Sequence, residues 1–110
     1  MLIRKNIYIS ESEIHNYGVF SKDFIKKGEL VEECHFIDIS STIELNSYRF
    51  PFKSGFIFPI GLCTSLNSSH NTNFLPNMTF DIDSESKIIR FFSTSDINIG
   101  DELLLWYLIF

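Results

Sequence analysis

Hydrophobic and polar positions alternate over short segments of this chain, and turn residues separate those segments. Ile3 to Ile9 predicts an opening strand, and a second strand is expected from Gly18, after the polar turn His15-Asn16-Tyr17. Lys26-Lys27-Gly28 predicts a turn, because glycine permits the positive φ that many turns require. A further strand is predicted from Glu29 to Ile39.

The middle of the chain is less regular. Thr42 to Phe50 favours a helix that Pro51 would end. Phe56 to Leu66 is apolar but interrupted by proline and glycine, so we expect buried, irregular extended structure without a helical face. Asn67 to Asn77 is rich in Asn and Ser, whose side chains bond to nearby backbone, and it is predicted to be a loop.

Strand signals return in the last third of the chain. Met78 to Asp83 alternates, Ser84-Glu85-Ser86 favours a turn, Lys87 to Ser93 completes a hairpin, and Glu102 to Tyr107 predicts a final strand. About eight short strands with one weak helix signal predict an all-β fold, mostly β with little helix. At 110 residues, the chain is expected to form one domain over residues 1–110.

The chain also contains an internal repeat. Phe20 to Glu29 and Phe92 to Asp101 align without a gap and share Phe, Ser, Ile, Gly and an acid at the same offsets. A solenoid would need three or more adjacent copies of its unit, whereas these two copies lie near opposite ends of the chain. We therefore expect two related hairpin-like units that pack against each other, with the residues between them available to build a site.

The acidic balance of the chain bears on its partners. A net charge of -5 disfavours nucleic acid as a direct ligand, since phosphate binding needs a basic face. A basic protein or peptide suits this charge better, and Glu32-Glu33 and Asp101-Glu102 are candidates to attract one. The alternative is that these carboxylates are solvated and only keep the protein soluble.

Cysteine use and apolar runs indicate the compartment. The two cysteines form no C-x-x-C pair and the amino terminus lacks the apolar run of a signal peptide, so an intracellular protein, cytoplasmic or nuclear, is expected. Leu103 to Phe110 contains eight apolar or aromatic residues, whereas a membrane span needs roughly 20. This segment is therefore expected to be a buried strand or a homodimer contact, and no membrane association is predicted.

Standard catalytic signatures are missing from the sequence. It has no P-loop, no G-x-G-x-x-G, no G-x-S-x-G and no H-E-x-x-H. Cys34-His35, Cys63 and His70 are conceivable metal ligands, but their spacing matches no recognised zinc pattern, so no metal site is predicted. The remaining candidates are distributed along the chain: a Tyr-Gly turn, the Asn-rich loop and the strand that ends in Tyr107.

Taken in order, Tyr17 to Glu33, Gly61 to Asn77 and Ile97 to Tyr107 resemble the SET domain of protein lysine methyltransferases. The first segment matches the family pattern of a G-x-G turn, an apolar strand and then I-x-x-G-E. The last segment matches the family pattern I-x-x-G-E-E-L followed by a Tyr. The likeness runs from about Ile7 to Tyr107 and is closest to the small, stand-alone viral members. It implies a β-clip of short strands with a carboxy-terminal pseudoknot.

The middle segment departs from the family signature N-H-S-x-x-P-N. Counting from Gly61 places Asn67-Ser68-Ser69 on its first positions, and counting back from the following hairpin places Pro76-Asn77 on its last two. An insertion of about four residues reconciles the two frames, and Ser68 then stands where the family has His. A third frame, from Asn71-Thr72-Asn73 to the same Pro-Asn pair, also lacks the His.

The resemblance assigns roles to individual residues. Tyr107 and Tyr17 would line the lysine channel as catalytic residues, and the methyl donor S-adenosylmethionine would be bound by Asn16, Tyr17, Gly18, Asn67 and Ser68. Asn16 stands where the family has a glycine, and asparagine is one of the few residues that tolerate the left-handed region. The implied activity is N-methylation of a lysine in a basic protein tail such as a histone tail.

An aromatic channel suits this reaction. Lysine has a reference pKa of about 10.4, so little neutral amine is present at neutral pH. Apolar walls disfavour the ammonium form, and a narrow channel fixes the line of attack on the methyl group. Tyrosines on both sides of the channel would supply such walls.

A second interpretation is a SET-like domain that has lost catalysis and serves as a protein-interaction module. The missing His, the inserted loop and the end of the chain at Phe110, soon after Tyr107, motivate it, since relatives continue into a segment that covers the channel. Structural roles are also open for the site residues: a core aromatic for Tyr107, a surface position for Tyr17 and an Asx-turn for Asn67. A third interpretation is an unrelated small β protein that binds a sugar or peptide.

Overall fold

The structure, a computed structural model, describes residues 2–39, 50–52, 55–68 and 74–105. In these ranges the chain forms short strands and one turn of 3-10 helix, which confirms the predicted all-β class. None of the described helical structure is long and apolar enough to cross a membrane. The elements are β1 (Ile7–Glu11), β2 (Tyr17–Ser21), β3 (Leu30–Ile39), β4 (Phe50–Phe52), β5 (Gly55–Pro59), η2 (Leu62–Ser65), β6 (Asn67–Ser68), β7 (Met78–Asp83), β8 (Ile88–Ser93) and β9 (Glu102–Leu105).

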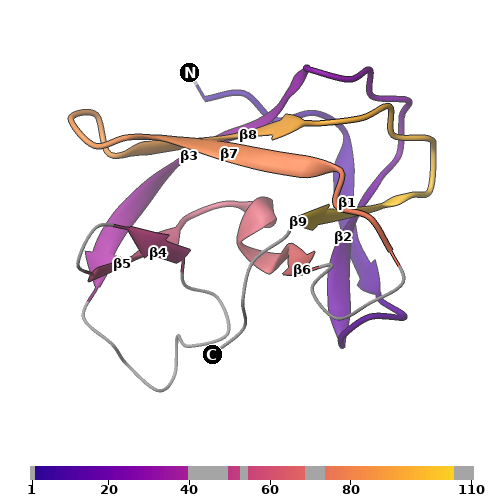
Figure 1. Cartoon of the computed structure of the whole chain (residues 1–110), viewed down its shortest axis with the longest axis horizontal. Helices are drawn as coiled ribbons and strands as arrows, with labels where there is room; N and C mark the ends of the chain where they lie inside the picture. Colours follow the sequence, from indigo (N-terminus) through magenta and orange to yellow (C-terminus); the bar gives the residue numbers. More distant parts are fainter. Residues whose placement is uncertain (1, 40–49, 53–54, 69–73, 106–110) are drawn as a thin grey trace.

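The strands form two sheets. One has the order β1-β2-β9-β6 and the other the order β4-β5-β3-β8-β7. Paired strands run antiparallel except β6 and β9, which are parallel. In Figure 1 the β7–β8 hairpin lies along the top of the molecule, the β1–β2 pair lies at the right, and η2 lies between the sheets. Because η2 contacts β1, β2 and β5, it links the two sheets.

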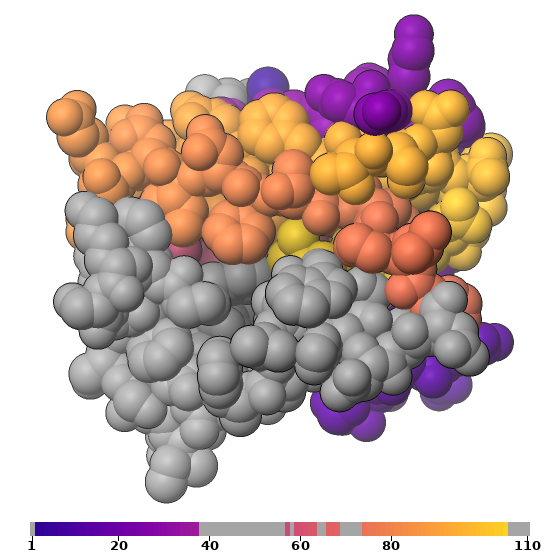
Figure 2. Space-filling view, viewed as in Figure 1, coloured from indigo at the N-terminus to yellow at the C-terminus, as the bar shows by residue number. Residues whose placement is uncertain are grey.

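The β7–β8 hairpin has the register that the sequence alternation predicts. Met78 pairs with Ser93 and Asp83 with Ile88, and Lys87 takes a positive φ of 57° in the turn before β8. Along β8, Ile89 and Phe91 are buried while their neighbours are partly exposed. The space-filling view shows this hairpin, in orange, covering the upper part of one face (Figure 2). Strict alternation therefore places one face of the hairpin on the core.

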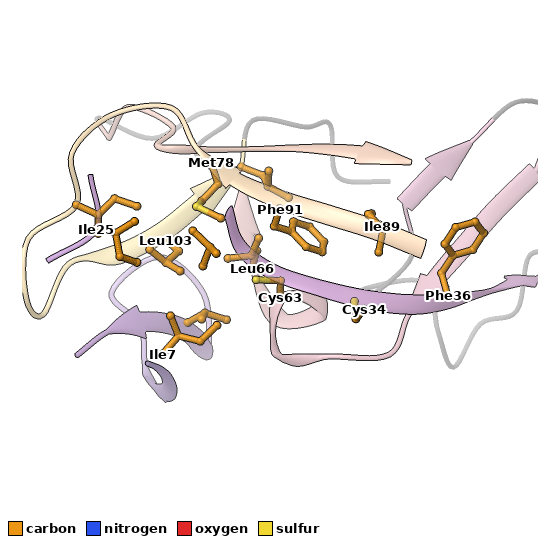
Figure 3. Close-up of a cluster of buried hydrophobic side chains, with 14 of the residues drawn as sticks. Ile7, Ile25, Cys34, Phe36, Cys63, Leu66, Met78, Ile89, Phe91 and Leu103 are labelled. Carbon is orange, nitrogen blue, oxygen red and sulfur yellow. The ribbon is translucent and has the colours of Figure 1, made fainter. Parts of the chain in front are cut away.

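Side chains from both sheets share one hydrophobic core. Figure 3 shows it as a continuous row, from Ile25, Leu103 and Met78 at one end to Ile89 and Phe36 at the other. Each large side chain that is wholly buried contributes about 2 kcal/mol relative to exposure. The core residues with no exposed surface are Val19, Val31, Ile57, Cys63, Ile89, Phe91, Ile97 and Leu103.

The two copies of the sequence repeat pair with each other. Ile25 and Ile97 exchange both backbone hydrogen bonds, with N···O distances of 2.9 and 2.8 Å. Gly28 N donates to Ser93 O at 2.9 Å, and the equivalent Gly100 N donates to Ser21 O at 2.7 Å. The copies are therefore related by an approximate two-fold axis through the Ile25–Ile97 pair, which confirms the prediction of two related units in contact.

Each repeat copy also closes its turn in the same way. The Glu29 carboxylate accepts the N–H of Lys26 at 2.7 Å, and the Asp101 carboxylate accepts the N–H of Asn98 at 2.9 Å. That hydrogen bond and the neighbouring Lys5 ammonium lower the pKa of Glu29. The acid shared by the two copies is thus a turn cap, since it accepts a backbone N–H that the turn leaves unpaired.

The glycines of these turns give a direct test of whether the two turns are equivalent. Gly28 and Gly100 have φ values of 86° and 88°, and nothing lies within 4 Å of a Cβ added to either. Gly28→Ala and Gly100→Ala should each lower the free energy of unfolding by about 1 kcal/mol, because only backbone strain is added. Urea denaturation measures this, with Ser95→Ala, at an exposed position, as the control. A loss at only one glycine would contradict the two-fold relation.

Two predictions from the sequence differ from the structure. Asn67 and Ser68, predicted as loop, form strand β6, because β9 supplies a parallel partner from the other end of the chain. Leu62–Ser65, predicted to lack helix, forms η2, whose first N–H groups bond to a buried carboxylate. Most of the helix predicted over Thr42 to Phe50 lies outside the described residues, and Phe50 itself begins β4.

Candidate functional site

The side chain of Asn67 lies at the centre of a polar cluster between β2, β6 and β9. Its Nδ2 is 3.1 Å from His15 O and 3.2 Å from Tyr17 O, so the amide donates to the turn that precedes β2. The same nitrogen is 3.1 Å from Ser12 Oγ and 2.9 Å from Glu102 Oε2. Asn67 is only 8% exposed, and its amide is therefore held in one orientation.

Gly18 is glycine because this cluster packs against its Cα. A Cβ at this position would collide with Glu102 Oε2 and lie 3.0 Å from Asn67 Nδ2. These atoms belong to two hydrogen-bonded side chains, the partly buried Glu102 and the buried Asn67, which have little room to move. The requirement here is close approach and not backbone conformation, since the positive φ of this turn is at Asn16, with a value of 42°.

Ser12 closes the turn that runs from residue 12 to residue 18, the 12–18 turn. Its N–H donates to Asn16 O at 2.8 Å, and its Oγ accepts the N–H of Ile14 at 3.0 Å. The hydroxyl also lies 2.7 and 2.9 Å from the two carboxylate oxygens of Glu102. The 12–18 turn is thus bonded directly to β9.

Asn77 holds β9 from the other end of the segment 67–77. Its Nδ2 donates to Glu102 O at 2.9 Å, its Oδ1 accepts the N–H of Leu104 at 2.7 Å, and its own N–H donates to Leu104 O at 3.0 Å. β6, at the start of the segment, pairs with the same strand, with Asn67 opposite Leu104. Both ends of the segment therefore bind β9.

The family model of the SET domain matches residues 16–108 of the chain. This chain belongs to the SET domain family. Among solved structures it is similar to a Plasmodium falciparum protein named as a candidate histone methyltransferase. The identity is 28% and the TM-score is 0.76 over 96% of each chain. No curated protein sequence matches the chain.

The SET domain also matches part of a much longer chain in the Polycomb Repressive Complex 2 of Chaetomium thermophilum. Its form bound to S-adenosylmethionine has 23% identity and a TM-score of 0.73. Its complex with H3K27me3 and H3K27M has 21% identity and a TM-score of 0.71. The match covers 96% of this chain and 15% of the Polycomb chain in both cases. At this identity the likeness shows the fold alone.

The structure brings together most of the residues predicted to form the site. Asn16, Tyr17 and Gly18 belong to the 12–18 turn that Asn67 binds, and Ser68 follows in β6, 3% exposed. The Tyr17 side chain is 60% exposed, and its carbonyl, not its ring, makes the contact with Asn67. Tyr107 lies outside the described residues, two positions after the end of β9 at Leu105.

Two acids have contacts that the sequence did not predict. Glu102, a candidate for a solvated carboxylate or an attractor of basic peptides, bonds Ser12 and Asn67 inside the cluster. Glu32 was also predicted to be solvated or to attract basic peptides. It is only 2% exposed, and its carboxylate accepts the N–H groups of Leu62 at 3.1 Å and Cys63 at 2.7 Å. Position in an acidic pair does not reveal burial, whereas alternation along a strand could have indicated it.

The two cysteines lie beside Glu32. Cys34 and Cys63 are free, buried thiols. His35, the position after Cys34, is exposed, because successive side chains on β3 point to opposite faces. No group of three or more metal-ligating side chains occurs among the residues that the structure describes. Of the conceivable ligands, His70 lies outside them. Burial, followed by the charge of Glu32, raises the pKa of Cys34 to about 12 and that of Cys63 well above its usual range.

These thiols should be inert in the folded protein. At pH 8, iodoacetamide should alkylate neither Cys34 nor Cys63 without urea and both in urea, as measured by mass spectrometry, because the thiolate is the nucleophile. Unfolded thiols titrate near 9.0 while the folded ones keep their protons. The free energy of unfolding should therefore fall as the pH rises above 9.0. Alkylation of the folded protein at the rate of the unfolded chain would contradict this account.

Proposed function

We propose that this SET domain is an S-adenosylmethionine-dependent protein lysine N-methyltransferase that acts on a basic protein tail such as a histone tail. The observation that carries the proposal is the fixed amide of Asn67. Its Nδ2 is engaged by the backbone carbonyls of the 12–18 turn and by Glu102, so Oδ1 is the atom of this amide that is suited to accept from a ligand. An acceptor beside a carboxylate suits a cationic ligand.

The backbone of the turn is held in one conformation beside Asn67. Gly18 has no side chain, which leaves room for the Glu102 carboxylate next to the turn, and Asn16 already takes the positive φ that the turn needs. Asn16, Tyr17, Gly18, Asn67 and Ser68 would hold S-adenosylmethionine, which supplies an activated methyl group when bound. The chain's own residues would orient that group and exclude water from it.

The lysine channel is proposed to lie between Tyr17 and Tyr107. The Tyr17 ring is exposed at the edge of the cofactor turn, which leaves it available to a bound peptide. β9 lies beside β2 and ends at Leu105, two positions before Tyr107, and the resemblance supports this second tyrosine as the other wall of the channel. Apolar walls would favour the neutral amine that attacks the methyl group.

The partners and the compartment are proposals of the same kind. The net charge of -5 supports a basic protein partner and argues against direct binding of nucleic acid. We also propose an intracellular protein, a homodimer and kinship with the small viral SET proteins. The cysteine use supports the first of these, and the resemblance of Tyr17 to Glu33 and of Ile97 to Tyr107 supports the last. Leu103–Leu105 of the apolar run are buried within the chain, so these three residues are not the dimer contact.

The alternative is a SET-like interaction module without catalysis. Ser68 favours it, because this residue stands in β6 where the family has a His, directly after the Asn67 that the cluster holds. The two functions differ in whether the chain binds the methyl donor.

Donor binding tests the proposal. S-adenosylmethionine should bind in a calorimetric titration, and Asn67→Ala should weaken its affinity about tenfold or more through the lost hydrogen bond. Gly18→Ala should abolish binding, because its Cβ would displace Glu102 and Asn67. Asn98→Ala, at an exposed asparagine of the second repeat copy, is the matched control. If millimolar donor does not bind to the folded wild-type protein, the enzyme proposal is wrong.

Methyl transfer tests the role of Tyr107. Incubation with histones and S-adenosylmethionine should add mass in steps of one methyl group, and Tyr107→Phe should change the rate or the number of methyls added. Tyr8→Phe removes a hydroxyl from a tyrosine that stacks on Phe20 in the first sheet, and serves as control. An unchanged methylation profile in Tyr107→Phe would remove this residue from the site.

A further inference from the structure

We propose that Glu102 is the positioning residue of the cofactor site: its carboxylate orients the Asn67 amide and ties the 12–18 turn to β9. The inference rests on the proposed function and deepens it, because it names the group that sets the geometry of the donor site. The sequence repeat assigns Asp101 to its turn but assigns no role to Glu102. The structure separates them by what each carboxylate contacts.

The contacts of Glu102 join three segments that are distant in sequence. The carboxylate lies 2.7 and 2.9 Å from Ser12 Oγ and 2.9 Å from Asn67 Nδ2, while the backbone of Glu102 pairs with Phe20 in β2. Its carbonyl oxygen accepts from Asn77 Nδ2 at 2.9 Å. The residue is therefore fixed at its backbone from two sides, and its carboxylate is a rigid acceptor for the turn and for β6.

The chemistry of the carboxylate determines which way the amide faces. An ionised carboxylate can only accept hydrogen bonds, so the Asn67 nitrogen must point toward it and the amide oxygen must point away. The carbonyls of His15 and Tyr17 impose the same direction. Hydrogen bonds to a charged acceptor are stronger than neutral ones, so Glu102 is the strongest of these acceptors.

Gly18 and Glu102 are complementary in this arrangement. A side chain at position 18 would occupy the place of Glu102 Oε2, so the carboxylate reaches the cluster only because position 18 is glycine. The partners of the carboxylate among the described residues are a hydroxyl and an amide, and its negative charge is therefore not neutralised by a cation there. That unneutralised charge next to the donor turn adds to the attraction for a cationic ligand.

The test replaces the acceptor by a near-isosteric group. Glu102→Gln removes the charge and faces the Asn67 amide with a side chain that also donates, so donor affinity should fall about 10- to 100-fold. Asp101→Asn is the matched control: it removes the same charge one position away, where the carboxylate contacts only the turn at Asn98 among the described residues, and it should change affinity by less than about threefold. Calorimetric titration with S-adenosylmethionine measures both.

A double variant separates positioning from a general structural effect. If Glu102 acts through the amide as well as through Ser12, Glu102→Gln combined with Asn67→Ala should lose less affinity than the two single losses added together. Ser12→Ala leaves the carboxylate in place but removes the bond to the turn, and it should weaken binding several-fold. If Glu102→Gln does not fold, the affinity of Ser12→Ala tests whether the bond between Ser12 and the carboxylate positions the turn.

Hydrogen exchange at backbone amides makes the inference testable without the donor. Glu102→Gln and Ser12→Ala should speed hydrogen exchange at the amides of residues 14–18 relative to Asp101→Asn, as measured by mass spectrometry or NMR. If the wild type does not bind the donor, the proposed function fails and this measurement still decides whether Glu102 fixes the turn. Equal affinities and equal exchange in Glu102→Gln and Asp101→Asn, or additive losses in the double variant, would overturn the inference.

Discussion

The pair of backbone hydrogen bonds between Ile25 and Ile97 is the contact on which the rest of the structure depends. It joins segments 72 positions apart in the sequence, and the flanking bonds from Gly28 and Gly100 repeat it on both sides. Both isoleucines are also buried in the core, at 1% and 0% exposure. Once these two turns are joined, β9 follows directly after the second one and lies beside β2.

That placement explains why the site can form at all. The 12–18 turn precedes one repeat copy and β9 follows the other, so the two-fold contact sets the distance between them. Asn67 and Asn77 then reach β9 from the middle of the chain. The candidate cofactor site is built from three segments, and each is positioned by backbone hydrogen bonds rather than by flexible side chains alone.

Local patterns predicted those parts of the fold that depend on neighbours in sequence. The β7–β8 hairpin follows from strict alternation, and the turns at Gly28 and Gly100 follow from glycine in the repeat. β6 could not be predicted in this way, because Asn67 and Ser68 become a strand only through a partner strand that begins 34 positions after Ser68, at Glu102. Glu32 and Glu102 were missed for a related reason: their donors come from other segments.

The parallel pairing of β6 with β9 has a consequence for synthesis of the protein. β9 is the last described strand, yet it lies between β2 and β6 in its sheet and supplies partners to both. Until residue 105 leaves the ribosome, β2 and β6 have no common neighbour, and the Asn67 amide lacks its carboxylate. The nascent chain can form the β7–β8 hairpin early, but the sheet that carries the site must assemble after translation of β9, through contacts between distant segments that form slowly.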